Sequence, residues 1–202
     1  MTITTIDLDT ELSAVNSILG SIGQSPITTI EYENPEIAFI YNLLKEVNQD
    51  VQNEGWHFNT EYHVEHIANN STISIPNTYL RFDLNENEVF KNYDLVRRDG
   101  KLYDLINHTN KFTDTLYLDI VHFQTFENIP PVFRRYIIAR ASVRAATQLV
   151  NNAELVRLLQ VQEAQTRASC MEYECQQGDH SYMGWPQDTS YRAFQPYKVL
   201  QR

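Results

Sequence analysis

The most informative segment of the chain reads Glu11-Leu-Ser-Ala-Val-Asn-Ser-Ile-Leu-Gly-Ser-Ile-Gly-Gln-Ser-Pro26. Its aliphatic side chains fall within one arc of a 3.6-residue wheel, which predicts a short helix with a single apolar side. Gly20 and Gly23 allow the backbone to leave the helix, and Pro26 prevents the helix from resuming nearby. No residue type in this segment is suited to catalysis, so we expect a packing element. The apolar positions are Leu12, Val15, Ile18, Leu19 and Ile22.

A second helix is predicted to follow this segment. Asn34 is suited to cap it, Pro35 fits the first turn, and Glu36 favours the positive end of the helix dipole. An apolar stripe continues from there to a predicted end of the helix at Gly55. The stripe consists of Ile37, Ile40, Tyr41, Leu44, Val47 and Val51.

From Trp56 the pattern changes to short β-prone runs separated by Asn, Asp and Pro residues. These runs predict an antiparallel sheet in the middle third of the chain. One turn within it is well marked, because Asp99-Gly100 between β-prone flanks is typical of a type I′ hairpin. The runs cover residues 61–67, 72–75, 78–84, 89–97, 101–106 and 115–123.

Helical character returns after Pro130-Pro131. The third helix carries two apolar stripes on different sides, so we expect it to be sandwiched between neighbouring helices. A fourth helix is predicted over about residues 152–175, with Glu163 and Arg167 in a favourable order on its outer face. The two stripes of the third helix are Val132, Tyr136, Ala139, Val143, Ala146 and Val150, and Ile138, Ala141, Ala145 and Leu149; the fourth helix has Leu155, Leu158, Leu159, Thr166, Cys170 and Tyr173.

Together these elements predict an α+β fold. Sequential helices with short loops pack antiparallel, so residues 1–54 and 130–176 are expected to form one split bundle of about four helices. Residues 55–129 are the inserted antiparallel β domain, and residues 177–202 form an extended C-terminal arm. The arm is too aromatic to be a solvated end, so its rings either fold back on their own domain or lie against another subunit. Those rings are Tyr182, Trp185, Tyr191, Phe194 and Tyr197.

Composition narrows the class of protein. A chain of 202 residues with 42% hydrophobic residues can bury a substantial core. The acidic amino terminus does not resemble an export signal, and residues 136–150 are too short and too charged to span a bilayer, so we expect a protein that is soluble and cytoplasmic when made. The net charge of −10 argues against a nucleic-acid binder but suits a channel wall that repels DNA. Cys170 and Cys175 are expected to be reduced, inert thiols.

The sequence contains no convincing catalytic or metal-binding pattern, and we expect no cofactor. His57, His63 and His66 lie close together, but strand geometry separates the last two and no Cys joins them. Acidic residues that are suited to act as the acid and base of a glycoside hydrolase occur, although they also fit a solvated acidic surface. A polysaccharide or cell-wall hydrolase therefore remains the alternative function. The acidic residues are Glu61, Glu65, Asp83, Glu86 and Glu88.

Two basic residues need a different explanation. Arg140 and Arg144 lie one turn apart on the largely apolar third helix, so they require anionic partners. Salt bridges within the chain or to a neighbouring subunit are the first interpretation, and contact with a DNA backbone is the second.

Several segments resemble, in the right order, the tail tubular protein A family, the head-to-tail adaptors of short-tailed, Autographivirus-type bacteriophages. The opening segment is the first of them. The others are Glu54-Gly-Trp-His-Phe-Asn59, Pro131-Val-Phe-Arg-Arg-Tyr-Ile137 with Arg140-Ala141, and Tyr173-Glu174 through Gln177-Gly178-Asp179. The segments cover about a quarter of the chain, and their joint order makes the match specific.

The resemblance implies a structural virion protein of the phage tail. It implies a ring of about twelve copies between the portal and the tail nozzle protein (tail tubular protein B), which forms part of the DNA ejection channel, passes genomic DNA without binding it specifically and offers attachment sites for tail fibres. The bundle would face the portal and the sheet the nozzle. The hairpin Arg97, Arg98, Asp99, Gly100 and Lys101 would then face the nozzle, and Arg140, Arg144 and the five arm aromatics would lie at a subunit or portal interface.

Overall fold

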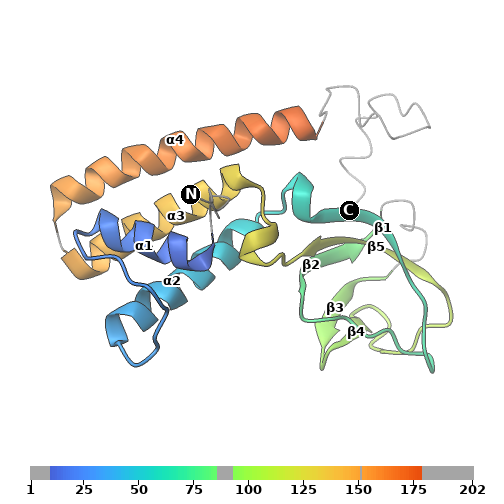
Figure 1. Ribbon diagram of the computed structural model, residues 1–202. Helices are drawn as coiled ribbons and strands as arrows, with labels where there is room; N and C mark the ends of the chain where they lie inside the picture. The colour runs from blue at the N-terminus through green and yellow to red at the C-terminus, as the bar shows by residue number, and fades with distance from the viewer. Residues whose placement is uncertain (1–9, 86–92, 151, 179–202) are drawn as a thin grey trace, which may run out of the picture.

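The computed structural model describes residues 10–85, 93–150 and 152–178. Within these residues the chain has an α+β fold, in which a helical half and a sheet half lie side by side (Figure 1). The helices are α1 (Glu11–Ser21), α2 (Pro35–Gln52), α3 (Pro131–Ala145) and α4 (Ala153–Gln177). The strands are β1 (Thr60–His66), β2 (Tyr79–Leu84), β3 (Leu95–Arg98), β4 (Lys101–Asp104) and β5 (Leu116–His122). The predicted class, with strands inserted between two pairs of helices, is confirmed.

The ends of α1 follow local signals in the sequence. The Thr10 side chain accepts a hydrogen bond from the backbone of the first turn. At the other end Gly23 has a φ of +82°, and the amide of Gln24 donates to the carbonyl of Leu19 across 2.9 Å. This is the arrangement of a Schellman motif, which needs a residue that tolerates positive φ. Gly23 therefore ends the helix, whereas Gly20 lies within it.

The second helix begins and ends as predicted. The Asn34 side chain accepts a hydrogen bond from the Glu36 amide at 3.0 Å, and Pro35 occupies the first turn. The helix stops at Gln52, and Gly55 has a φ of +79° in the turn that follows. Its buried face contains the predicted stripe, apart from the partly exposed Tyr41, and adds Leu43.

The core of the helical half is built around α3, which contacts α1, α2 and α4. Its largest buried side chains, Phe133, Tyr136 and Ile137, are at most 1% exposed and meet residues from all three neighbours. Burying side chains of this size stabilises a fold by about 1.5–3 kcal/mol each. The prediction of a sandwiched helix is confirmed.

The apolar stripes of the last two helices are shorter than predicted. One turn of π-helix, Ala146–Val150, follows α3. Its wider turn shifts the angular position of the residues that follow, so Leu149 and Val150 are 42% and 37% exposed instead of lying in the core. The fourth helix contacts the bundle along a narrow line, and Leu158, which was placed in its inner stripe, is 66% exposed.

The strands form two sheets, not the single sheet that was predicted. One has the order β1-β5-β2 and the other pairs β3 with β4, and every pairing is antiparallel. The β-prone run at residues 72–75 makes only isolated bridges, so its prediction as a strand was wrong. Its Ile73 and Ile75 are nevertheless buried in the core of the sheet half. The apolar pattern of this run therefore reflects burial without a continuous ladder.

The hairpin between β3 and β4 turns at Asp99-Gly100, with Arg98 paired to Lys101. Both turn residues have positive φ, +51° at Asp99 and +70° at Gly100. Two consecutive positive φ values define a type I′ turn, so this prediction is confirmed.

A buried network of amides joins the helical half to the sheet half. Gln52, at the end of α2, is 0% exposed and bonds to the backbone of Gln124, just after β5. Asn59, 2% exposed, donates to the carbonyls of Gln52 and His122 at 2.9 and 3.0 Å. Its side-chain oxygen accepts a hydrogen bond from the Trp56 amide at 2.8 Å. The network fixes where the sheet half leaves the bundle.

Candidate interaction surfaces

The two arginines of α3 both find anionic partners within the chain. Arg140 Nη1 lies 3.1 Å from Glu54 Oε1, just beyond α2. Arg144 lies further along α3, where Nη2 is 2.7 Å from Asp50 and Nη1 is 3.4 Å from Glu46. The predicted need for acidic partners is met by salt bridges inside the chain. The role of these arginines at a subunit or portal interface stays a prediction.

Glu54 also forms an ion pair with an arginine of α4, Arg167. Arg167 was expected on the outer face beside Glu163, but its Nη2 lies 3.0 Å from Glu54 Oε2. Its Nη1 also donates to the Tyr136 hydroxyl at 2.6 Å. The hydrogen bonds to Glu54 and Tyr136 raise the pKa of Arg167 above its ordinary value. This cluster ties α4 to α3 and to the end of α2.

A groove opens between α2 and the end of α3. Its volume is about 410 Å³. It holds both apolar and charged side chains, and Phe39 within it is 36% exposed. The sequence did not predict this groove, because it arises where two helices pass each other. We call it the α2–α3 groove; its lining residues are Phe39, Asn42, Leu43, Glu46, Arg144 and Gln148.

The outer face of α4 carries exposed apolar side chains. Only Leu159 and Cys170 of this 25-residue helix are buried, whereas Val161 and Met171 are 55% and 47% exposed. A spacing of three and four residues places four exposed apolar positions in line on the side opposite Leu159 and Cys170. We call Val161, Ala164, Ala168 and Met171 the α4 row.

The hairpin arginines lie over aromatic rings of the sheet half. Arg97 Nη2 donates to the Tyr79 carbonyl of β2. The Arg98 guanidinium carbon lies 4.0 Å from the centroid of the Tyr103 ring. Together with the Asp99-Gly100 turn and the exposed Lys101 that follow them, these arginines form the tip that is expected to face a nozzle. That role stays a prediction, and the five aromatic residues of the arm lie outside the described residues.

The histidines take ordinary structural positions. His63 stacks on Tyr117 with centroids 4.2 Å apart. His66 lies 3.0 Å from the Val64 carbonyl and 3.2 Å from the Tyr79 hydroxyl. In the parts of the chain that the structure describes, no group of three or more His, Cys, Asp or Glu residues is arranged to hold a metal ion.

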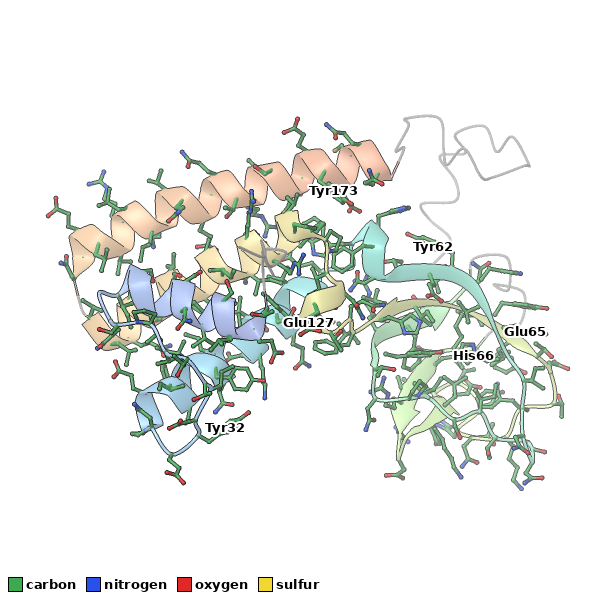
Figure 2. The ribbon with its side chains drawn as sticks, in the orientation of Figure 1. Tyr32, Tyr62, Glu65, His66, Glu127 and Tyr173 are labelled. Carbon is green, nitrogen blue, oxygen red and sulfur yellow. The ribbon has the colours of Figure 1, made fainter. Side chains whose placement is uncertain are left out.

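Of the carboxylates considered for hydrolysis, Glu61 and Glu65 lie on β1 and Asp83 lies on β2. Glu61 lies 3.5 Å from His122, and Asp83 accepts a hydrogen bond from the amide of its own neighbour. Figure 2 shows Glu65 in the sheet half, at the other end of the molecule from Tyr32. Glu86 and Glu88 lie outside the described residues.

The cysteines are free among the described residues. Cys170 is fully buried, with its sulfur 3.5 Å from the Val132 carbonyl, and burial raises the pKa of its thiol to about 12. Cys175 is exposed near the end of α4. Across the same described part of the chain, no helix combines the length and apolar character that crossing a membrane requires.

Comparison with known protein families gives a clear match. Residues 12–180 match the family model Tube, described as tail tubular protein. The matched span runs from the first turn of α1 to beyond the end of α4, so it includes both the helical half and the sheet half. None of the curated proteins compared matches the chain.

Proposed function

Because the chain belongs to the tail tubular protein family, we propose that it is the ring-forming adaptor that joins the portal to the tail nozzle of a short-tailed bacteriophage. Membership makes it a structural protein of the phage tail. The observation that carries the proposal is the family match over residues 12–180. The position between portal and nozzle, the number of copies and the ejection channel are the parts that we add.

The architecture supports an adaptor that contacts different partners at its two ends. The helical and sheet halves lie side by side (Figure 1), and buried hydrogen bonds of Gln52 and Asn59 join them. Buried, fully paired polar networks hold elements in one arrangement. A rigid joint of this kind suits a subunit that passes load from one ring to the next. In the proposal, the parts at residues 1–54 and 130–176 meet the portal and residues 55–129 meet the nozzle.

A ring of identical subunits requires heterologous contacts, in which one face of a subunit meets a different face of the next. The surface around Arg144 belongs to the α2–α3 groove and supplies one candidate face. The aromatic arm at residues 177–202 is a further candidate, for a neighbour or for the portal. We place the Arg97 to Lys101 hairpin on the nozzle side. Tail fibres would attach to the exposed surface of the sheet half.

Passing DNA would meet an acidic protein. A net charge of −10 repels a phosphate backbone, so genomic DNA slides without specific binding. A gel-shift titration at low salt is expected to show no retained complex. A protein–DNA complex whose affinity falls steeply as the salt concentration rises would instead identify a DNA-binding connector.

The decisive experiment is electron microscopy of the purified chain, alone and mixed with a portal ring from the same phage. We expect rings of about twelve copies, or a second ring stacked on the portal. Particles that remain single subunits at every concentration and never join the portal would overturn the proposal. Removal of residues 177–202 tests the arm, because unchanged assembly would mean that the arm does not serve the ring.

A further inference from the structure

The α4 row is an unusual surface for a single subunit. Between Arg157 and Glu172, the only charged residues of α4 are Arg167, which Glu54 engages, and the partly exposed Glu163. Outer faces of surface helices are normally charged, and loss of charge is what distinguishes the centre of protein interfaces. Val161 and Met171 add large exposed apolar groups, and Ala164 and Ala168 leave room for a close approach. The surface therefore fits another helix.

The α2–α3 groove offers a matching surface on the other side of α3. Figure 1 shows α4 along one edge of the bundle and α2 along the other. Phe39 contributes an exposed ring to the groove, and its apolar partner Leu43 lies one turn further on. Since α3 contacts both α2 and α4 and lies between them, one copy cannot bring its own row to its own groove. Any contact between the row and the groove is therefore a contact between two copies.

Charge complementarity selects the register of this contact. Arg157 continues the α4 row by one turn, is exposed, and forms no ion pair with any residue that the structure describes. On the groove, the Glu46 side chain is 68% exposed and shares Arg144 with the closer Asp50, which leaves excess negative charge there. Opposite charges across an interface fix its register and guide its partners.

The spacings on the two helices agree with an antiparallel pairing. Glu46 lies seven residues after Phe39, and Ala164 lies seven residues after Arg157. If Arg157 faces Glu46, then Ala164 comes to face Phe39, where a small side chain accommodates a ring. Both spacings equal two helical turns, so the charged pair and the apolar pair form together.

We infer that the α4 row of each copy, with Arg157, docks into the α2–α3 groove of the next copy and forms the contact that repeats around the ring. The inference rests on the proposed ring and assigns its subunit interface. The contact is heterologous, so it closes a ring without any two-fold related surface.

The first test disables each face separately in the full chain. Ala164→Glu places a charge in the row, and Phe39→Glu places one in the groove; Ser169→Glu is the matched control, because Ser169 is exposed on α4 outside the row. Sedimentation of each variant is measured over a concentration series, alone and with the portal ring. We expect both row and groove variants to lose association by about tenfold or more, and the control to assemble as the unmodified chain does. Asn42→Glu, at an exposed groove position, repeats the groove test if Phe39→Glu fails to fold.

Mixing the two disabled variants separates a heterologous contact from a symmetric one. A pair made of one copy of each variant has one intact row, from Phe39→Glu, and one intact groove, from Ala164→Glu. The mixture should therefore form dimers and no larger assembly. Rows that instead pair with each other would leave Phe39→Glu fully competent to assemble, which overturns the inference.

Charge reversal tests the register. Arg157→Glu and Glu46→Arg should each weaken assembly, and the chain that carries both should recover it. A double variant that is weaker than either single variant overturns the pairing of these residues. Rings that form normally with the portal in every variant overturn this interface but leave the proposed function standing, whereas an unmodified chain that never assembles overturns both.

Discussion

The side-chain amide of Gln52 pairs with the backbone of Gln124 as one strand pairs with the next. Gln52 Oε1 accepts from the Gln124 amide at 2.7 Å, and Nε2 donates to the Gln124 carbonyl at 2.9 Å. Nε2 also donates to Asn48 one turn earlier on α2. A helical side chain thus takes the place of a missing ladder partner at the point where β5 returns to the bundle.

Replacing Gln52 should therefore lower the stability of the fold far more than replacing an ordinary surface glutamine would. Gln52→Leu keeps the volume but leaves the amide and carbonyl of Gln124, a partly buried residue, without these partners, and each orphaned group costs up to about 1–3 kcal/mol. We expect the midpoint of urea unfolding to fall accordingly. Gln49→Leu, at an exposed position on the same helix, is the control and should change the midpoint little. Equal midpoints for the two variants would contradict this account of the joint.

Local signals account for the parts of the fold that the sequence predicted well. The Asn34 cap, the Gly55 stop and the Asp99-Gly100 turn each depend on residues within a few positions, so each is visible in a single sequence. The pairing of strands, in contrast, depends on residues far apart in the chain. β1 pairs with β5 through Thr60 and Val121, and alternation shows that a strand exists without showing its partner. The division into two sheets was missed for that reason.

The candidate surfaces show the same limit. The need of Arg140 and Arg144 for acidic partners follows from their place on an apolar helix, whereas the identity of those partners depends on how α3 crosses α2. The α4 row was present in the sequence, but the Leu-rich inner stripe is the stronger signal. It led to Leu158 being placed on the wrong side.

Gly55 is predicted to resist substitution more than other glycines. Its φ of +79° disfavours any L side chain, and an added Cβ would lie 2.7 Å from Arg81 Nη2 and 3.3 Å from Val121 Cγ2. Gly55→Ala should therefore destabilise the fold by about 1–2 kcal/mol or more, measured by thermal unfolding. Gly20→Ala is the matched control, since Gly20 is helical with no atom within 4 Å of an added Cβ. It should raise stability by about 0.5–1 kcal/mol. A change in stability of the same sign for Gly55→Ala and Gly20→Ala would rule out this explanation.

The Glu54 cluster should contribute modestly to the attachment of α4. The Arg167 side chain is 46% exposed, and exposed ion pairs contribute only about 0–1 kcal/mol. Arg167→Met should lower stability by that order, and high salt should reduce the difference because it screens the lost charge pair. Chemical unfolding at low and high salt measures both effects. Arg135→Met, at an exposed position of α3 with no ion pair to a described residue, provides the comparison, and a larger loss of stability there would contradict the assignment.

Asp104 is predicted to make the stability of the sheet half depend on acid pH. Its side chain is 0% exposed and accepts hydrogen bonds from the amides of Asp94, Ile106 and Asn107 and from the Asn107 side chain. Burial by itself raises the pKa of the Asp104 carboxyl, but these four hydrogen bonds favour the charged form and hold the pKa below its ordinary value.

A pKa that is lower in the folded chain than in the unfolded chain stabilises the fold above the unfolded pKa, about 4, and this contribution disappears as the pH falls through the folded pKa. Asp104→Asn places an amide where four donors converge, so at neutral pH it should destabilise the fold by about 1–3 kcal/mol. The difference from the unmodified chain should shrink as the pH falls below 4. Asp99→Asn keeps a good type I′ turn at the hairpin and serves as the control, with little change at any pH. Urea unfolding at a series of pH values measures the difference, and a gap between Asp104→Asn and the unmodified chain that stays constant into strong acid would mean that the Asp104 charge is not what these amides stabilise.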